Sequence, residues 1–358
     1  MNQSRAEKIA AFNPDGVGLV NDSLFGLPFT EEECAVVVIP VPWEVTTSYH
    51  RGTAAGPAGI LEASSQLDLF HPELGEVWKA GFFLRQPAAE ILQLNDELLP
   101  RAHQLIELLE AGKAEHEAAR VHELQAQITS AGRTVNTRVL EQARQLLAGG
   151  KLPAVLGGEH STPLGLLQAL NEHYDSFGIL QLDAHADLRR AYMGLEFSHA
   201  SIMYNALQLP AVTQLTQVGV RDYSPGEHRL IQASADRIRF FGDNLLKRRA
   251  FEGTLWHSQC LEIVVGLPQK VYVSFDIDGL RPSLCPGTGT PVPGGLSFQA
   301  AAYLLGEVVR SGRRIVGFDL CEVAANSPEN DFDYNVGARV LWELCAWAVE
   351  SNGILPRN

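Results

Sequence analysis

The stretch FGILQLDAHAD, residues 177–187, passes directly from a run of apolar side chains to alternating acidic and imidazole side chains. Phe177–Leu182 has the length and composition of a buried strand. Successive side chains of an extended chain point to opposite faces, so Asp183, His185 and Asp187 would project together from its end. Taken alone, the pattern suits a ligand set for metal ions or a polar turn capped by aspartates.

Apolar runs of this kind recur along the chain. Several are continuous rather than alternating, as is typical of strands covered on both faces. Helix-like stretches lie between them, including Thr162–His173 and Leu296–Val309. This alternation predicts an α/β fold with a mostly parallel sheet between helical layers. The expected strands are Ala35–Pro40, Pro153–Leu156, Phe177–Leu182, Leu215–Val220, Ile238–Phe241, Val271–Phe275 and Arg314–Phe318.

Two helical regions can be described further. In the first helix named above, Thr162 occupies the expected N-cap and Pro163 the first helical position. Residues from about 93 to 149 are rich in Leu, Ala, Glu, Gln and Arg and predict two or more long helices, with Gly112 and Gly132 as candidate breaks. These helices would form a solvated layer on the sheet or contact another subunit.

The composition indicates a globular protein, with 46% hydrophobic and 20% charged residues. A formal net charge of -14 argues against a nucleic-acid groove, which needs a basic face. No apolar run approaches the roughly eighteen residues of a membrane helix, and the N-terminus lacks the hydrophobic region of a signal peptide. The five cysteines form no C-x-x-C pair, which favours a reducing compartment. We therefore expect a cytoplasmic protein without a membrane or nucleic-acid partner.

Ligand-type side chains collect where other expected strands end. His160 follows one strand within GGEHS, and Glu322 follows another. Asp276 and Asp278 follow a third, two residues apart and on one face. Singly, the histidine could be an ordinary loop residue and the aspartate pair a turn. Because open α/β sheets build their sites beyond the carboxyl ends of the strands, the agreement among these clusters favours one shared site.

The charge of the clusters indicates metal ions. Four aspartates and two neutral histidines would carry about four negative charges, which must be paired or bind metal if they are buried. Two divalent cations would offset that charge. Oxygen-rich ligation with some imidazole suits Mn²⁺, and the absence of cysteine from the clusters argues against a structural zinc site. Two such ions roughly 3.5–4 Å apart can lower the pKa of a shared water.

The motifs GGEHS, DAHAD and SFDIDGLRPSLCPGTGTPVPGG, in this order, resemble those of the ureohydrolase family of arginases and agmatinases. The resemblance extends from about Cys34 to the C-terminus. It implies a three-layer α/β/α fold around a mostly parallel sheet of about eight strands. Residues 1–33 would be an N-terminal arm or extension, and residues 34–358 a single catalytic domain. It also implies a centre of two Mn²⁺ ions, with Ni²⁺ as an alternative, and a homo-oligomer, either a trimer or a hexamer.

The resemblance also assigns the metal ligands, which are two histidines and four aspartates of these motifs. One ion would be held by His160, Asp183, Asp187 and Asp276. The other would be held by His185, Asp183, Asp276 and Asp278, so that Asp183 and Asp276 bridge the two ions.

Catalytic roles follow from the same comparison. Glu322 matches the family's carboxylate that pairs with the substrate guanidinium, an interaction that forms a two-pronged charged hydrogen bond. His199, in FSHAS, matches the histidine thought to pass protons to the leaving amine, a task suited to a pKa near neutrality. Asp187 would help to steady the tetrahedral species formed from the guanidino carbon. The implied reaction is metal-assisted hydrolysis of a guanidino group to urea and an amine.

Substrate identity depends on residues outside these motifs. Arg189 lies where the family commonly contacts the distal end of the substrate. If Arg189 faces the pocket, it would repel an ammonium group and favour a carboxylate; if it points outward, no preference follows. The loop 41–57 resembles an agmatinase-like substrate loop, with Tyr49, His50 and Arg51 as candidate contacts. We expect agmatine hydrolysis to putrescine and urea, while arginine, a guanidino acid such as guanidinobutyrate, a formimino acid and free guanidine stay open.

The sequence departs from the family at one point. The segment after the aspartate pair usually reads D-x-D-x-x-D-P, and here Arg281 stands in place of the last aspartate. Local ion pairing and loop geometry therefore stay open. Two other classes of protein are alternatives, a deacetylase-like amide hydrolase and a catalytically silent assembly subunit. The first generally has one zinc and lacks the full set of six ligands, so the intact His160 of GGEHS and Glu322 argue against it. The second would have lost ligands, and none of the six is lost.

Overall fold

Eight strands form one sheet in the order β2-β1-β3-β8-β7-β4-β5-β6 in the computed structural model, which describes residues 3–19, 22–327 and 331–355. Every neighbouring pair is parallel. The strands are β1 (Val36–Val41), β2 (Phe82–Leu84), β3 (Leu152–Gly157), β4 (Phe177–Leu182), β5 (Val212–Val218), β6 (Ile238–Phe241), β7 (Lys270–Asp276) and β8 (Arg314–Cys321).

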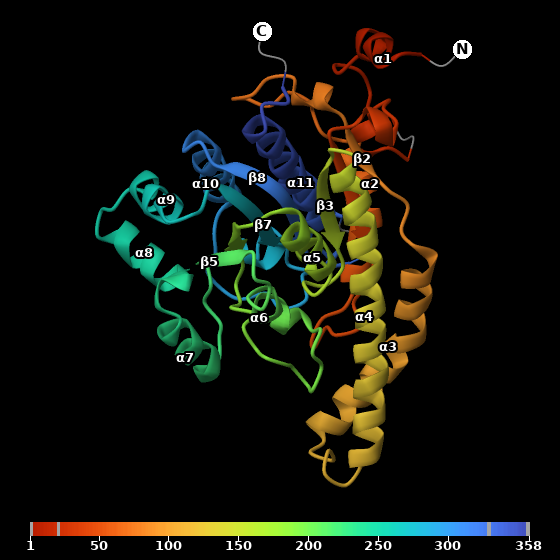
Figure 1. Cartoon of the computed structure of the whole chain (residues 1–358), viewed down its shortest axis with the longest axis vertical. Helices are drawn as coiled ribbons and strands as arrows, with labels where there is room; N and C mark the ends of the chain where they lie inside the picture. Colours follow the sequence, from red (N-terminus) through yellow and green to blue (C-terminus); the bar gives the residue numbers. More distant parts are fainter. Residues whose placement is uncertain (1–2, 20–21, 328–330, 356–358) are drawn as a thin grey trace.

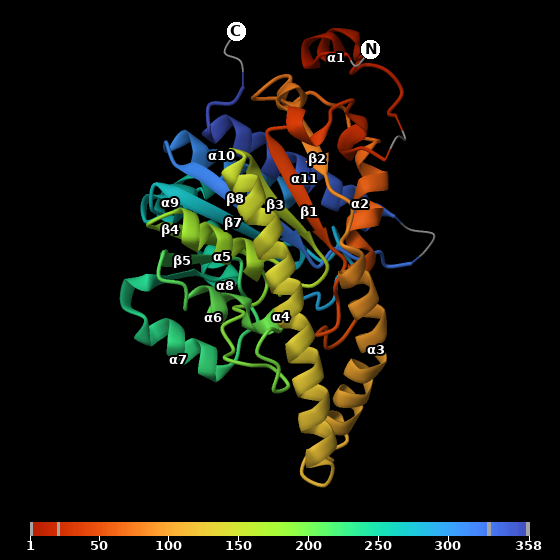
Figure 2. The same ribbon diagram turned by 45° about the vertical axis from the view of Figure 1, so that its right-hand side comes forward.

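Helices cover both faces of the sheet (Figures 1 and 2). Along β1, Val36 and Val38 belong to one hydrophobic core, and Val37 and Ile39 belong to the other. Helices α2 and α8 to α11 contribute to the first core, and α3 to α7 contribute to the second. The helices are α1 (Arg5–Ala11), α2 (Gly56–Ser64), α3 (Ala89–Glu110), α4 (Ala118–Ala148), α5 (Leu164–His173), α6 (Ile202–Ala206), α7 (Pro225–Ala233), α8 (Asp243–Phe251), α9 (Trp256–Val265), α10 (Phe298–Arg310) and α11 (Phe332–Ser351). The prediction of a three-layer α/β/α fold is confirmed.

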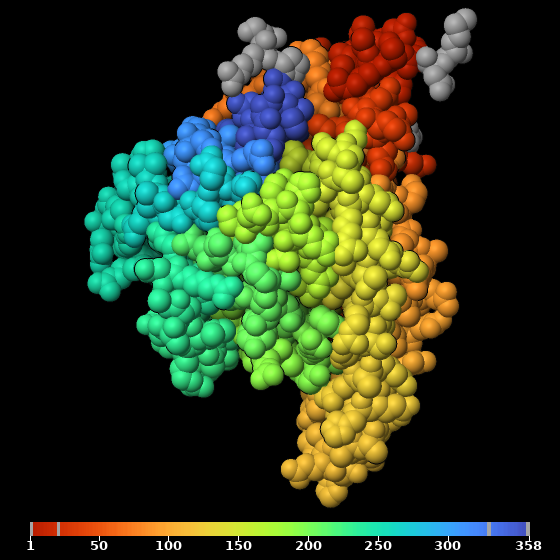
Figure 3. All heavy atoms as spheres, in the orientation of Figure 1, coloured from red at the N-terminus to blue at the C-terminus, as the bar shows by residue number. Residues whose placement is uncertain are grey.

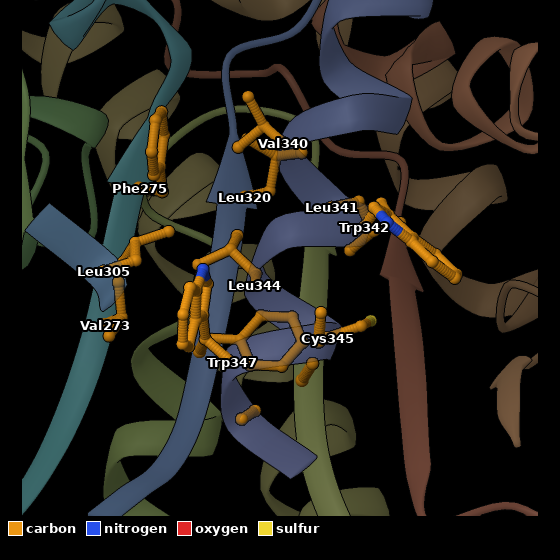
Figure 4. Packing of buried hydrophobic residues seen from close by; sticks show 14 of the residues in the cluster. Val273, Phe275, Leu305, Leu320, Val340, Leu341, Trp342, Leu344, Cys345 and Trp347 are labelled. Carbon is orange, nitrogen blue, oxygen red and sulfur yellow. The ribbon is translucent and has the colours of Figure 1, made fainter. Parts of the chain in front are cut away.

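Burial of apolar side chains holds α11 against the sheet. The apolar side chains of this helix lie against the sheet, and Leu344 and Trp347 belong to the same hydrophobic cluster as Leu320 of β8 (Figure 4). Such burial removes apolar surface from water at about 25 cal/mol per Å². Ahead of β1, Phe25 is also buried, and its ring meets the Trp342 ring edge-on at 5.1 Å. The segment that precedes the first strand therefore packs on α11.

The seven expected strands are confirmed as β1 and β3 to β8, with ends that shift by a few residues. Strand β2 was missed because three residues at a sheet edge are too few to show a pattern. The expectation of an N-cap at Thr162 is wrong, since α5 begins at Leu164 with Pro163 in the cap position. The Thr162 hydroxyl instead donates to the carbonyl of Glu159 at 2.9 Å, within the turn that carries His160.

The long helical segment consists of α3 and α4, which project beyond the sheet as a pair (Figures 1 and 3). Gly112 lies between them with φ +64°, as expected for a break. The second expected break is wrong, because Gly132 lies inside α4. A Cβ atom at Gly132 would be 3.2 Å from Cβ of Phe197, so this glycine permits close packing rather than ending the helix. Among the described residues, no helix has the length and apolar character needed to cross a membrane.

Candidate metal centre and active site

The sheet order brings the predicted site residues together. Strands β3, β8, β7 and β4 are consecutive neighbours and all parallel, so their carboxyl ends meet at one edge. His160 follows β3 and Glu322 follows β8. Although these two residues are 162 positions apart, the backbone N–H of His160 donates to Oε1 of Glu322 at 2.8 Å. Asp276 ends β7, and Asp183 directly follows β4.

One group of possible metal ligands surrounds His160. Its Nδ1 atom lies 3.1 Å from Oδ2 of Asp183, 3.1 Å from Oδ2 of Asp187 and 3.2 Å from Oδ2 of Asp276. All four side chains are buried. His160, Asp183 and Asp276 have ligand atoms close enough together to hold one metal ion.

A second group surrounds His185. Its Nδ1 atom lies 3.0 Å from Oδ2 of Asp278 and 3.7 Å from Oδ1 of Asp183, and these three residues could hold another ion. Asp183 therefore directs one carboxylate oxygen toward each histidine, as a bridging ligand would. Asp276 belongs to the first group, and its Oδ1 accepts the backbone N–H of Asp278 at 2.8 Å, so its predicted bridging role stays a prediction.

The aspartates also shape the loops that carry them. Oδ1 of Asp183 accepts the N–H of His185 at 2.6 Å, and Oδ1 of Asp278 accepts the N–H of Ala184 at 2.9 Å. These contacts are the turn-capping bonds of the alternative interpretation. Asp183 and Asp278 each give one oxygen to a turn and direct the other toward a histidine, so the turn-capping contacts leave the metal-ligand interpretation open as a prediction.

Two of the site residues have a left-handed backbone. Asp187 has φ +53° and Glu322 has φ +63°, a conformation that non-glycine residues rarely adopt. The carbonyl of Asp187 accepts two backbone N–H groups at the start of α6, from Met203 at 3.1 Å and Tyr204 at 3.2 Å. Glu322 is held by its backbone N–H, which donates to the carbonyl of Gly158 at 2.8 Å. Such strain collects at functional sites.

The electrostatics of the two groups favour cations. Burial and the neighbouring carboxylates raise the pKa of Asp183 and of Asp276, and they raise the pKa of Asp187 to about 7. The pKa of Asp278 is lowered: burial alone would raise it, but His185 and the surrounding hydrogen bonds outweigh that effect. Carboxylates this close and this buried can all ionise only when positive charge is supplied.

The orientation of His160 fits a metal ligand. Its Nε2 atom lies 2.8 Å from Oγ of Ser274, whose hydroxyl also bonds Asp319. An Nε2–H that donates to Ser274 leaves the Nδ1 lone pair facing the carboxylates, and Nδ1 is buried without a hydrogen-bond partner. A protein ligand of this kind is usually fixed by such an outer hydrogen bond. The residues present therefore fit a metal ion.

Glu322 offers a buried carboxylate next to a narrow recess. Burial and the nearby Glu159 carboxylate raise the pKa of Glu322 well above its ordinary value. A side chain at Gly289 would bring its Cβ within 3.1 Å of Oε2 of Glu322, so the glycine keeps this oxygen accessible. The recess is also lined by His199 and Thr290. An acid in this state is suited to binding a cation that arrives from the cavity.

His199 is positioned through a hydroxyl that sequence reasoning missed. The Thr46 hydroxyl donates to Oε1 of Glu159 at 2.6 Å, so its oxygen is left to accept. It accepts the backbone N–H of His199 at 3.1 Å and lies 3.4 Å from Nδ1 of the ring. Oγ of Ser198 also lies 3.4 Å from this Nδ1, so the ring is held next to two hydroxyl groups. Burial, reinforced by His185, lowers the pKa of His199 to about 4, so the ring is neutral at pH 7.

A cavity of about 160 Å³ connects the centre to the surface, and Arg189 faces it. The Arg189 guanidinium lies 5.0 Å from the centre of the Tyr192 ring, and Nε lies 3.9 Å from Oε2 of Glu227. The structure thus places Arg189 toward the pocket, with its charge opposed by a carboxylate. Asp222, which the sequence did not single out, also lines this cavity.

The other predicted substrate contacts do not line the cavity that Arg189 faces. Tyr49 is 70% exposed and stacks on His50 with ring centres 4.0 Å apart. Both residues touch the recess of Glu322, and with Arg51 they line a separate cavity of about 520 Å³. Arg281 is exposed, and its backbone N–H donates to Leu296 at 2.9 Å. The departure from the family motif therefore lies outside both ligand groups.

Thr46, Ser274 and Asp319 are the supporting residues that sequence reasoning missed. Ser274 lies two positions before Asp276 on β7, so the alternation of a strand places both on one face. That spacing was a usable signal. Thr46 carried none, since its contact with His199 joins segments 153 residues apart.

Comparison with known proteins identifies the family of the chain. The model of the arginase family matches residues 34–346. An N(1)-aminopropylagmatine ureohydrolase of Thermus thermophilus is 32% identical over 296 residues, which cover 82% of this chain and 84% of that protein. Agmatinase of Bacillus anthracis is 28% identical over 293 residues, covering 82% and 84%.

Solved structures agree in fold. Agmatine ureohydrolase of Thermoplasma volcanium aligns with a TM-score of 0.67 at 22% identity, covering 97% of this chain and 99% of that one. Proclavaminate amidino hydrolase of Streptomyces clavuligerus aligns with a TM-score of 0.70 at 20% identity, covering 94% and 100%. The α/β/α fold with a parallel sheet is therefore shared with these two structures. The chain belongs to the arginase family, which confirms the resemblance carried by its motifs.

Proposed function

We propose that this protein is a dimetal ureohydrolase that converts agmatine to putrescine and urea. The observation that carries the proposal is the position of Asp183, whose two carboxylate oxygens face two different histidines, the buried His160 and the partly exposed His185. One ion in each group would neutralise carboxylates that are otherwise too close to ionise together. The names of the agmatinase relatives support the choice of agmatine.

The cofactor is proposed to be two Mn²⁺ ions, with Ni²⁺ as an alternative. Two types of support are the oxygen-rich donor set and the unpartnered Nδ1 of His160. The six proposed ligands are His160, Asp183, His185, Asp187, Asp276 and Asp278. When bound, such ions supply the Lewis acidity that activates water near neutral pH.

The chain's own residues would orient the substrate and handle protons. Glu322 would hold the guanidinium by a two-pronged charged hydrogen bond, which fixes the guanidino carbon over the ligand groups. His199, whose Nδ1 lies 3.4 Å from the Thr46 hydroxyl, would take up at Nε2 the proton that the attacking water releases and pass it to the departing amine. Asp187 would steady the tetrahedral carbon centre.

The far end of the cavity would receive the amine of agmatine. Its lining contains Arg189 with the acidic side chains of Asp222 and Glu227. The cation is opposed by Glu227 at 3.9 Å, and Asp222 adds a further carboxylate, so this end favours an ammonium group. N(1)-aminopropylagmatine is a second candidate substrate, because the relative that acts on it shares 32% identity with this chain.

Urea release from purified protein tests the proposal. The protein is stripped of metal, reloaded with Mn²⁺ or Ni²⁺, and offered agmatine, N(1)-aminopropylagmatine, arginine, guanidinobutyrate, a formimino acid and guanidine. Two ions per chain and preferred hydrolysis of agmatine are expected. Metal-dependent hydrolysis of arginine or guanidinobutyrate alone would keep the centre and overturn the substrate, whereas failure to bind any ion would overturn both.

We also propose a cytoplasmic homo-oligomer, a trimer or hexamer, in which residues 34–358 form the catalytic domain and residues 1–33 an extension. The support is the family membership. Light scattering coupled to size exclusion measures the number of subunits, and a monomer at micromolar concentration would overturn the assembly.

A further inference from the structure

Two buried glutamines lie side by side beneath the DAHAD loop. Gln181 of β4 and Gln217 of β5 are register partners, and both are 0% exposed. The Nε2 group of Gln217 donates to Oε1 of Gln181 at 2.7 Å. Burying amides is costly unless they are hydrogen bonded, and apolar residues would fill the interior of a sheet more cheaply. A specific role should therefore account for the pair.

The pair contacts the loop at three points. Nε2 of Gln181 donates to Oδ2 of Asp183 at 2.7 Å and reaches the carbonyl of His185 at 3.4 Å. Nε2 of Gln217 donates to the carbonyl of Ala186 at 2.8 Å. One carboxylate and two consecutive backbone carbonyls of the loop are thereby tied to the two strands.

The hydrogen bonds of the pair run in one direction. An amide can flip and present either oxygen or NH₂ to a neighbour. Because Gln217 donates to Oε1 of Gln181, that oxygen is occupied, and Gln181 must turn its NH₂ group toward Asp183. Without Gln217, Gln181 could flip and direct its oxygen at the carboxylate. The second glutamine therefore fixes the orientation of the first.

The hydrogen bond from Gln181 is made to a carboxylate oxygen of Asp183, a proposed metal ligand. Oδ2 of Asp183 is the oxygen that lies 3.1 Å from Nδ1 of His160, while Oδ1 accepts the N–H of His185. Both oxygens of this carboxylate are thus held before any ion arrives. Hydrogen bonds to a ligating carboxylate set its direction and commonly change metal affinity by about 10- to 100-fold.

We propose that Gln181 and Gln217 are positioning residues of the metal centre. Gln217 orients the amide of Gln181, and Gln181 holds Asp183 in the direction that serves both ligand groups. The inference rests on the proposed dimetal function.

The test compares Gln181→Leu, Gln217→Leu and the double variant with the wild type. The readouts are the Mn²⁺ dissociation constants from competition with a chelator, the number of ions per chain, and the melting temperature of the metal-free protein. Gln259→Leu is the matched control, because Gln259 is a buried glutamine of α9 whose side-chain amide has no hydrogen-bond partner among the described residues.

Gln181→Leu should weaken Mn²⁺ binding by about 10- to 100-fold, and Gln217→Leu by a smaller factor. The double variant should bind no more weakly than Gln181→Leu, because both residues act through one bond to Asp183. Gln259→Leu should bind like the wild type.

Mn²⁺ binding by folded Gln181→Leu within about twofold of the wild type would overturn the inference. An equal loss in Gln259→Leu would also do so. If Gln181→Leu fails to fold, the Mn²⁺ affinity of Gln217→Leu tests the inference, because Gln217 touches no proposed ligand side chain. Unchanged Mn²⁺ affinity in Gln217→Leu would then refute the positioning role of both glutamines. A wild-type protein that binds no Mn²⁺ would overturn the proposed function itself. If the wild type binds two ions and the glutamine variants bind them equally well, only the role of the glutamines is overturned.

Discussion

Nδ1 of His160 lies 3.1 Å from Oδ2 of Asp183, across the boundary between two loops that follow different strands. This contact is the point at which the GGEHS and DAHAD motifs meet. Because β3 and β4 are separated in the sheet by β8 and β7, only the folded sheet order brings the two side chains together.

Replacing Asp183 or Asp276 by alanine should remove bound metal and lower agmatine hydrolysis by more than about 1000-fold, beyond the loss of a single electrostatic contact. Each change deletes a carboxylate that faces His160. Elemental analysis and urea release measure the two effects. Asp236→Ala is the control, because Asp236 is exposed and belongs to neither ligand group. Full activity in either variant would contradict the dimetal centre.

Glu322→Gln should leave metal content unchanged and lower kcat/KM for agmatine by about 100-fold, the scale of losing one partner of a buried charged pair. The amide oxygen can still accept the N–H of His160, so the loop is expected to keep its shape. Steady-state kinetics with metal analysis separate the two effects. Equal kinetic constants in variant and wild type would remove Glu322 from the guanidinium site.

Thr46→Val should lower kcat by about tenfold, a fraction of what general acid catalysis contributes, with little change in metal affinity. The change deletes the oxygen that accepts the backbone N–H of His199 and lies 3.4 Å from Nδ1 of its ring. Thr46→Ser keeps that oxygen and should restore the rate. A pH–rate profile that is identical in Thr46→Val and the wild type would argue against this route to His199.

Stability without metal should depend on pH through Asp187. Its pKa is about 7 in the folded protein, whereas an unfolded aspartate titrates near 3.9. Between these values the folded protein keeps a proton that the unfolded chain has lost, so the free energy of unfolding falls as pH rises and levels off above about pH 7. Thermal unfolding of the metal-free protein at several pH values measures this dependence. The melting temperature of Asp187→Asn should fall less steeply with pH than that of the wild type. A melting temperature that rises from about pH 5 to 7 would refute it.

Arg189→Gln should raise kcat/KM for agmatine several-fold and lower it for guanidinobutyrate. The substitution removes a cation that faces the cavity, while Glu227 and Asp222 stay in place. Nearby charges at a partly exposed site interact by about 1 to 4 kcal/mol, less at high salt. Kinetics on both substrates at two ionic strengths measure the change. An agmatine rate that falls would show that the arginine supports the substrate instead of opposing it.

The sequence was informative where physical signals are local. Continuous apolar runs predicted seven strands, and acid or imidazole residues just after them predicted where the site lies. The pairing of β3 with β8 joins Ala154 to Phe318, and no local pattern announces such a distant partner. The same limit explains why the contacts of Thr46 and Gln217 were missed. Tertiary packing also outweighed the helix-breaking tendency of Gly132, since Phe197 lies against this glycine within α4.

Asp183 and Asp278 each accept a backbone N–H within the loops of the site through Oδ1, which has a consequence for the binding of the proposed ions. The loops gain their shape from internal hydrogen bonds and thus stand preformed, so cations can leave and return without the chain refolding. Loading should therefore be fast and reversible, and the occupancy of the centre would follow the supply of metal in its surroundings.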